Sequence, residues 1–140
     1  MAIEKTLSII KPDAVERNLQ ESFIQRFKKE GFKILAKKEA LLTKEEAQDF
    51  YIEHKGKVFY ESLVNYMTSG PVVLMVLERE NAILKNREVM GATNPKDAAP
   101  GTLRKEYAVS LEKNSVHGSD SPASAAREVE FFFPELVKCC

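Results

Sequence analysis

The sequence Val72-Val73-Leu74-Met75-Val76-Leu77 is the stretch that says most about the fold. A short, continuous apolar run rich in branched side chains predicts a buried strand rather than a helix. Gly70 and Pro71 precede it and end a helix that we expect from Phe59 to Met67. Another helix is expected from about Asn81 to Met90, so this strand lies between two helices.

Three other segments have the character of strands. Residues Thr6–Ile10 alternate and end at Lys11-Pro12-Asp13, which is a turn signal. A second strand is expected from Phe32 to Leu42, although lysines interrupt it. Residues Ser115–His117 predict a last, short strand.

Helices are expected between these strands. A stripe of apolar residues at helical spacing predicts a first helix that stops at Gly31: Leu19, Phe23, Ile24 and Phe27. Thr43 and Glu46 fit a capping box, in which a helix through Phe50 begins. Ser121 as N-cap and Pro122 at the first helical position predict the last helix.

The segment Gly91–Thr102 is rich in Gly, Pro, Asn and Ala and is expected to be a long loop. Long ordered loops in compact domains are uncommon and often functional. The order of the elements predicts one α+β domain over residues 1–140. We expect a four-stranded antiparallel sheet with helices packed on one face.

The composition limits the classes of partner that the protein is expected to bind. The chain has 140 residues, of which 44% are hydrophobic and 30% are charged, and its formal net charge is zero. This balance offers no bulk attraction to nucleic acid or to a membrane, so phosphate binding would need a local basic cluster. The first residues lack the features of a signal peptide, and the apolar run Pro71–Leu77 is too short to span a bilayer. A cytoplasmic location is expected.

Several site classes are excluded by absent motifs. The sequence has no P-loop, dinucleotide-binding or nucleophile-elbow motif. Its histidines, His54 and His117, have no cysteine near them, so a structural zinc is not expected. Cys139 and Cys140 are adjacent and cannot form a disulfide framework. A terminal Cys-Cys also occurs in some prenylation signals, but we favour an ordinary reduced tail.

His117 is the candidate nucleophile. It stands in Asn114-Ser115-Val116-His117-Gly118-Ser119-Asp120-Ser121-Pro122, just before the predicted last helix. Gly118 is expected to let a ligand approach closely, and the helix N-terminus to favour an anion. A largely neutral imidazole is a good nucleophile near neutral pH. The alternative from local sequence is a turn histidine that bonds only the nearby backbone.

Residues around the long loop add candidate phosphate ligands. Arg87, Thr93 and Arg104 flank it, and two guanidinium groups with a hydroxyl suit polyphosphate oxygens. The alternative is that the arginines are solvated surface residues. Phe59 is placed to stack on a base, although a core role is the commoner one for phenylalanine.

The motif Asn114-x-x-His117-Gly118-Ser119-Asp120 resembles the active-site signature of nucleoside diphosphate kinases. The resemblance covers nearly the whole chain, through further blocks in the family's order: Thr6–Val15, Ser69–Val73, Gly91–Pro95, Pro100–Arg104 and Ala126–Phe133. It implies a ferredoxin-like fold. It also implies a ping-pong reaction in which a nucleoside triphosphate phosphorylates His117 and a nucleoside diphosphate then takes the phosphoryl group.

The resemblance also implies roles for single residues. Glu128 would orient His117, with Ser119 assisting and Tyr51 packed nearby. Lys11 and Asn114 would hold the ribose hydroxyls, and Lys11 would also lie near the transferred phosphate. The phosphates would be bound by Arg87, Thr93 and Arg104, with His54 close by. Phe59 would stack on the base, beside Leu63 and Leu111. Magnesium would bridge the phosphates and need few direct protein ligands.

The same resemblance implies broad use of bases and sugars, and a homo-oligomer built from dimers, either a tetramer or a hexamer. Glu21 and Arg79 depart from the family pattern, which usually has glycine at both positions. Two other function classes remain as alternatives. One is a catalytically inactive binding module, and the other is a histidine-dependent phosphohydrolase, although the H-x-H-x-H run of histidine-triad hydrolases is absent.

Overall fold

The computed structural model describes residues 3–52, 55–58, 60–92, 94–108, 115–119 and 121–134. In these residues the sheet has four strands: β1 (Ile3–Ile10), β2 (Lys33–Ala40), β3 (Val72–Glu80) and β4 (Val116–Gly118). Their order is β2-β3-β1-β4, and every neighbouring pair is antiparallel. The predicted ferredoxin-like α+β class and four-stranded sheet are confirmed.

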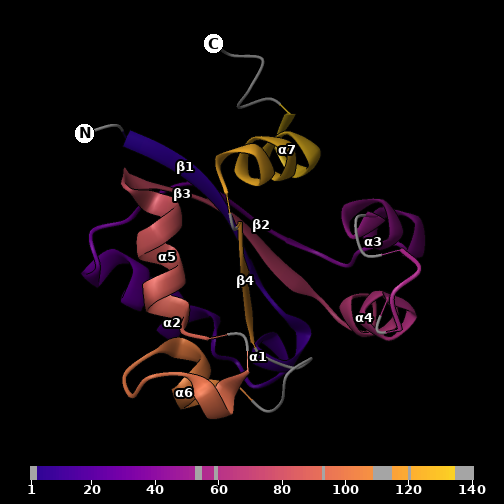
Figure 1. Ribbon diagram of the computed structural model, residues 1–140, viewed down its shortest axis with the longest axis horizontal. Helices are drawn as coiled ribbons and strands as arrows, with labels where there is room; N and C mark the ends of the chain where they lie inside the picture. Colours follow the sequence, from indigo (N-terminus) through magenta and orange to yellow (C-terminus); the bar gives the residue numbers. More distant parts are fainter. Residues whose placement is uncertain are drawn as a thin grey trace.

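The helices lie on both sides of this sheet (Figure 1). One side carries α1 (Pro12–Glu16), α2 (Gln20–Lys29), α5 (Ala82–Met90) and α6 (Leu103–Tyr107). The other side carries α3 (Lys44–Phe50), α4 (Tyr60–Met67) and α7 (Pro122–Phe132). A short 3-10 turn, η2 (Pro95–Asp97), precedes α6.

The expectation that helices cover one face was wrong. Side chains of β3 alternate between two cores: Val72, Leu74 and Val76 pack with α3, α4 and α7, whereas Val73, Met75 and Leu77 pack with α2 and α5. A strand buried on both faces has no polar alternation, which is why residues 72–77 form a continuous apolar run.

The local helix signals in the sequence act as expected. Thr43 Oγ1 accepts a hydrogen bond from the Glu46 N–H, and the Glu46 carboxylate accepts one from the Thr43 N–H. Ser121 caps α7 through a bond from the Ser124 N–H. Gly31 follows the end of α2 with φ +90°, a conformation that glycine adopts without steric cost.

Two short helices were not predicted. Pro12, expected in a turn, is the first residue of α1, and Thr102 caps α6 by accepting a bond from the Lys105 N–H. The segment expected to be one loop, residues 91–102, contains η2. Each of these elements is too short to show helical periodicity, so only its N-terminal signal was present. No helix in the described part of the chain combines the length and apolar character needed to cross a membrane.

Candidate active site

Strand register decides which way His117 faces. His117 pairs with Ile9 across the β1–β4 ladder, and directly opposed residues share a face of the sheet. Ile9 is fully buried in the core formed with α3, α4 and α7. His117 therefore lies on the side of the sheet that α3 and α7 cover.

Glu128 on α7 holds the imidazole. Its Oε1 lies 2.9 Å from His117 Nε2 and accepts a 2.8 Å hydrogen bond from Ser119 Oγ. Ser119 Oγ in turn accepts a bond from the Leu7 N–H on β1. A carboxylate only accepts hydrogen bonds, so Nε2 carries the proton and Nδ1 keeps its lone pair.

The end of α3 packs against the same imidazole. The ring of Phe50 lies edge-on to His117 with centroids 5.5 Å apart, and the Tyr51 ring is 6.5 Å away. Burial, with the negative charge of Glu128 as a smaller cause, raises the pKa of Tyr51. The phenol is therefore protonated throughout the physiological range. Sequence reasoning did not single out Phe50 for this site.

Lys11 lies at the end of β1, beside the start of β4. Its N–H donates to the Ser115 carbonyl at 2.9 Å, which extends the pairing of these strands by one step. Lys11 is extended and two residues beyond Ile9, so it shares the face of Ile9 and His117. Lys11 is only 6% exposed.

Arg104, one of the candidate phosphate ligands, lies on α6 and contacts β4. Its guanidinium donates to the carbonyls of Gly91 and Val116, at 3.0 and 2.8 Å. Burial, and then the charge of Arg87, lowers the pKa of Arg104 to about 10, so the group is still cationic at neutral pH. Since Val116 directly precedes His117, Arg104 braces the strand that carries the histidine.

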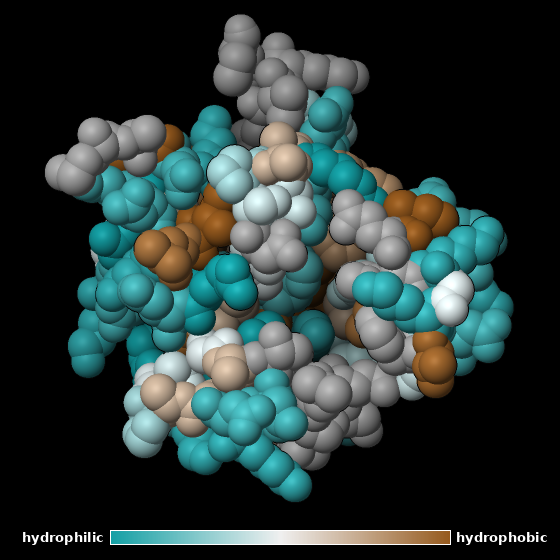
Figure 2. Space-filling view, in the orientation of Figure 1, coloured by the Kyte–Doolittle hydropathy of each residue, from teal (hydrophilic) through white to brown (hydrophobic). Residues whose placement is uncertain are grey.

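Arg87 and Arg104 line one open pocket of about 660 Å³ beside α5 and α6, together with the acidic Glu88 and Asp97. Arg87 itself is exposed, whereas Arg104 is buried. Figure 2 shows that the surface on this side is mostly hydrophilic and is hollowed between α4 and α6, next to β4. Arg104 is therefore tied to the strand that carries His117, whereas Arg87 lies on the exposed side of α5.

The interpretation of Gly118 as an opening for a ligand was wrong. A Cβ at this position would overlap Nδ2 of Asn86 and come within 2.7 Å of Cε of Met90, both on α5. Glycine is required here because α5 packs directly against β4. The space beside Gly118 is filled by the protein.

Other predicted residues are placed as follows. Leu63 on α4 is half-buried and packs against the core on the His117 side. Arg79 donates to the carbonyl of Glu30 at the end of α2, and Glu21 accepts a bond from Gln25 on the exposed side of α2. These contacts explain how both departures from glycine are accommodated. Five predicted site residues lie outside the described residues, as does Asp120 of the motif: His54, Phe59, Thr93, Leu111 and Asn114. The Cys139–Cys140 end also lies outside them.

Comparison with known proteins decides the family. The family model described as nucleoside diphosphate kinase matches residues 4–137. The chain belongs to the nucleoside diphosphate kinase family.

Solved structures of nucleoside diphosphate kinases are similar to this chain over nearly its whole length. The Aquifex aeolicus enzyme is 44% identical, with a TM-score of 0.93 over 94% of this chain and 96% of its own. A Halobacterium salinarum enzyme, solved in complex with CDP, is 40% identical, with a TM-score of 0.91 over 94% and 88%. The Encephalitozoon cuniculi enzyme is 36% identical, with a TM-score of 0.90 over 93% and 88%.

As a nucleoside diphosphate kinase family member, the chain is a phosphotransferase that acts on nucleotides. Its described residues contain no group of three or more His, Cys, Asp or Glu side chains arranged to hold a metal ion.

Sequence reasoning also missed four polar residues behind the site, Asp13, Arg17, Tyr66 and Ser115. Asp13 and Arg17 are one helical turn apart, whereas Tyr66 and Ser115 reach Asp13 only through the tertiary fold.

Proposed function

We propose that the protein transfers the terminal phosphoryl group of a nucleoside triphosphate, typically ATP, to a nucleoside diphosphate by a ping-pong mechanism through His117. The observation that carries this proposal is the 2.9 Å contact between His117 Nε2 and Glu128 Oε1. It leaves Nδ1 as the nitrogen with a lone pair, in an imidazole whose ring is held by Phe50 and Glu128.

The reaction divides into two balanced transfers. In the first, the Nδ1 lone pair bonds to the γ-phosphorus while the bond from that phosphorus to the bridging oxygen breaks, and the diphosphate leaves with the electron pair. In the second, a terminal oxygen of the acceptor diphosphate attacks the phosphorus, and the electron pair of the N–P bond returns to Nδ1. Throughout, Glu128 would stabilise the Nε2 proton, because phosphoryl transfer places positive charge on the ring.

Cationic side chains would bind the phosphates. Arg104, Arg87 and Lys11 supply positive charge on two sides of β4, and charge neutralisation is the main demand of phosphoryl transfer. Within the same proposal, Thr93 and His54 contact phosphates, Asn114 and Lys11 hold the ribose, and Ser119 and Tyr51 support the histidine. Phe59, Leu63 and Leu111 would contact the base.

Magnesium belongs to this proposal as part of the nucleotide complex. Arg104 beside β4 offers N–H donors, which suit phosphate oxygens and do not ligate a metal ion. When bound, Mg²⁺ would neutralise charge on the phosphates, with phosphate oxygens and water as its ligands.

The proposal also covers substrate specificity, assembly, location and partners. Stacking without base-edge contacts would give broad use of purine, pyrimidine, ribo- and deoxyribonucleotides. Residues 1–140 would act as one catalytic domain in a homo-oligomer built from dimers, tetramer or hexamer, in the cytoplasm. No nucleic-acid or membrane partner is expected from the zero net charge.

Labelling with γ-labelled ATP and no acceptor tests the mechanism. We expect label that is acid-labile and alkali-stable, that is absent from His117→Ala, and that moves to an added nucleoside diphosphate. Label released mainly as free phosphate would favour a phosphohydrolase. Folded, magnesium-supplied protein that takes up no label would contradict the proposed mechanism.

Turnover measured across the common diphosphates tests base selectivity, and a strong preference for one base would contradict the stacking argument.

A further inference from the structure

We infer that Asp13 is a positioning residue, whose carboxylate holds the backbone bearing Lys11 and the backbone bearing His117 at a fixed separation through its bond with Ser115. This inference rests on the proposed function, in which both residues act on the same phosphoryl group. The side chains that the Asp13 carboxylate bonds are those of Arg17, Tyr66 and Ser115, so it would act on His117 through the backbone.

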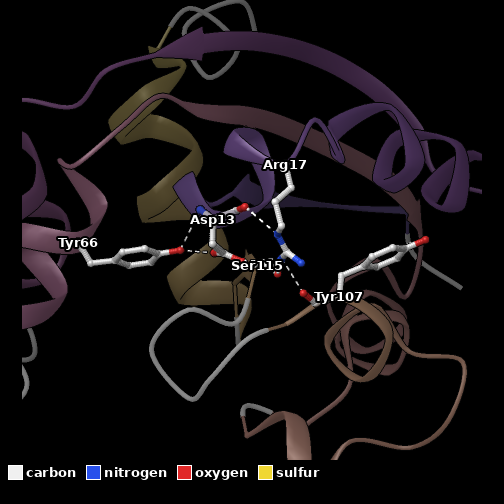
Figure 3. Close-up of polar contacts among 5 residues, drawn as sticks. All are labelled: Asp13, Arg17, Tyr66, Tyr107 and Ser115. Carbon is white, nitrogen blue, oxygen red and sulfur yellow. Dashed lines mark hydrogen bonds and ion pairs between the residues drawn. The ribbon is translucent and has the colours of Figure 1, made fainter.

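The Asp13 carboxylate is a buried acceptor for three side chains (Figure 3). Its Oδ1 accepts from the Tyr66 hydroxyl on α4. Its Oδ2 accepts from Ser115 Oγ at 2.6 Å and from the Arg17 guanidinium at 3.1 Å. Asp13 is only 7% exposed, so these bonds replace the hydration that a buried carboxylate loses.

The bond between Asp13 and Ser115 links the two reacting segments. Asp13 stands two residues after Lys11, and Ser115 stands two residues before His117. The same segments also meet directly, because the Lys11 N–H donates to the Ser115 carbonyl. Two cross-links therefore join the end of β1 to the start of β4.

Ser115 needs such a restraint. Its φ is +72°, in the left-handed region that residues other than glycine rarely adopt, and its side chain is fully buried. A hydroxyl bonded to Asp13 selects this conformation over the extended one. The conformation of Ser115 sets the direction in which β4 leaves the turn, and thus where His117 lies.

Arg17 and Tyr66 anchor the carboxylate to other parts of the site. The Arg17 guanidinium donates to the Tyr107 carbonyl at 2.6 Å, at the end of the helix that carries Arg104. It also donates to the backbone carbonyl of Asp13. One carboxylate thus connects the segments that bear Lys11, His117 and Arg104.

The test compares Asp13→Asn with the wild type. An amide has one acceptor oxygen and an NH₂ donor, so it cannot accept from all three side chains. We expect the single-turnover rate of His117 phosphorylation by ATP to fall about 30-fold, because sub-ångström misplacement of reacting groups lowers rates steeply. The dissociation constant for ADP should change less than about 3-fold, since the contacts that bind the nucleotide are unaltered.

Two controls separate positioning from stability. Phe27→Leu shortens a fully buried side chain on α2, on the opposite side of the sheet, and should lower the melting temperature without changing the phosphorylation rate. Thr68→Val replaces a hydroxyl that bonds the Val64 carbonyl within α4, outside the Asp13 contacts, and serves as the match for Ser115→Ala. Ser115→Ala decides the question if Asp13→Asn does not fold, with an expected rate loss of about 10-fold.

The outcomes are distinct. Wild-type protein that forms no phosphohistidine refutes the proposed function. Wild-type protein that does form it, with a variant rate within 2-fold of wild type, overturns the role of Asp13. A loss no greater than that of the control of equal stability overturns it as well, since the effect would then be general destabilisation. A slower rate with nearly unchanged ADP affinity supports it.

Discussion

The guanidinium of Arg104 donates a 2.8 Å hydrogen bond to the carbonyl of Val116, the residue directly before His117. A second nitrogen of the same group donates to Gly91 at the end of α5. Arg104 therefore fixes the strand that carries His117 on the side facing α5, and under the proposed function it also binds phosphate.

Arg104→Lys should damage both roles at once. A lysine ammonium is a point charge and cannot reproduce the planar fork that spans two carbonyls. We expect kcat/KM to fall by roughly 100-fold and the free energy of unfolding by about 1–2 kcal/mol. Steady-state kinetics and denaturant unfolding measure the two effects. Arg26→Lys is the control, because Arg26 is a partly exposed arginine that bonds the Gly101 carbonyl and Glu106 away from β4.

Glu128→Gln should slow phosphoryl transfer more than it weakens nucleotide binding. The amide keeps the shape but loses the charge that stabilises the Nε2 proton, so we expect a loss on the order of 100-fold in kcat. Ser119→Ala removes only one donor to Glu128 and should cost less than about 10-fold in rate and about 1 kcal/mol of stability. Equal losses in the two variants would contradict the assignment of Glu128 as the group that orients the imidazole.

The free energy of unfolding should depend on pH in the alkaline range because of Tyr66. Burial, and then its hydrogen bond to Asp13, raise the pKa of Tyr66 above its ordinary value. The stabilisation is complete below the unfolded pKa of about 10 and is lost as pH rises further, because the unfolded tyrosine ionises while the folded one keeps its proton. The free energy of unfolding should then fall with pH by about 1.4 kcal/mol per unit from this residue.

Tyr66→Phe should flatten that decline. Denaturant unfolding at several pH values between 9 and 11.5 measures the slope for each protein. Phe27→Leu adds no titrating group and should lower the free energy of unfolding by the same amount at every pH. A Tyr66→Phe slope identical to wild type would mean that the Tyr66 proton is not held more tightly in the folded protein.

Gly118→Ala should destabilise the protein through a steric conflict with α5. A Cβ there meets Asn86 and Met90, and overpacking of this kind costs about 1–3 kcal/mol. Asn86→Ala in the same chain should recover part of the loss, so that the double variant is more stable than the sum of the single effects predicts. Thermal unfolding of the four proteins in this cycle measures the coupling, and strict additivity would refute the conflict.

Local features of the fold could be predicted where a few neighbouring residues decide them. The continuous run 72–77 predicted β3, and Thr43 with Glu46 predicted the start of α3. The same run also indicates burial on both faces, because it lacks the polar alternation of a strand with one solvent-facing side. Five-residue helices such as α1 and α6 show no periodicity, so only Pro12 and Thr102 signalled them.

The site was predictable only in part, for a related reason. The sequence and its family resemblance pointed to His117 and Glu128, but spacing along the chain did not bring them together; β1–β4 register and the packing of α7 do. The contacts of Asp13 join residues 53 and 102 positions away, to Tyr66 and Ser115. Gly118 was misinterpreted because its neighbour, α5, is distant in the sequence.

The two cores on opposite faces of β3 place part of the interior, the buried side of α2, away from the layer that holds the histidine. Residues 72, 74 and 76 point to the layer in which His117, Phe50 and Glu128 meet, whereas residues 73, 75 and 77 point to the layer of α2 and α5. α2 carries none of the proposed site residues, so substitutions of its buried side chains would change how tightly the chain folds while the histidine keeps its surroundings. A lineage moving to a hotter or colder habitat therefore has the α2 side of its interior in which to adjust stability.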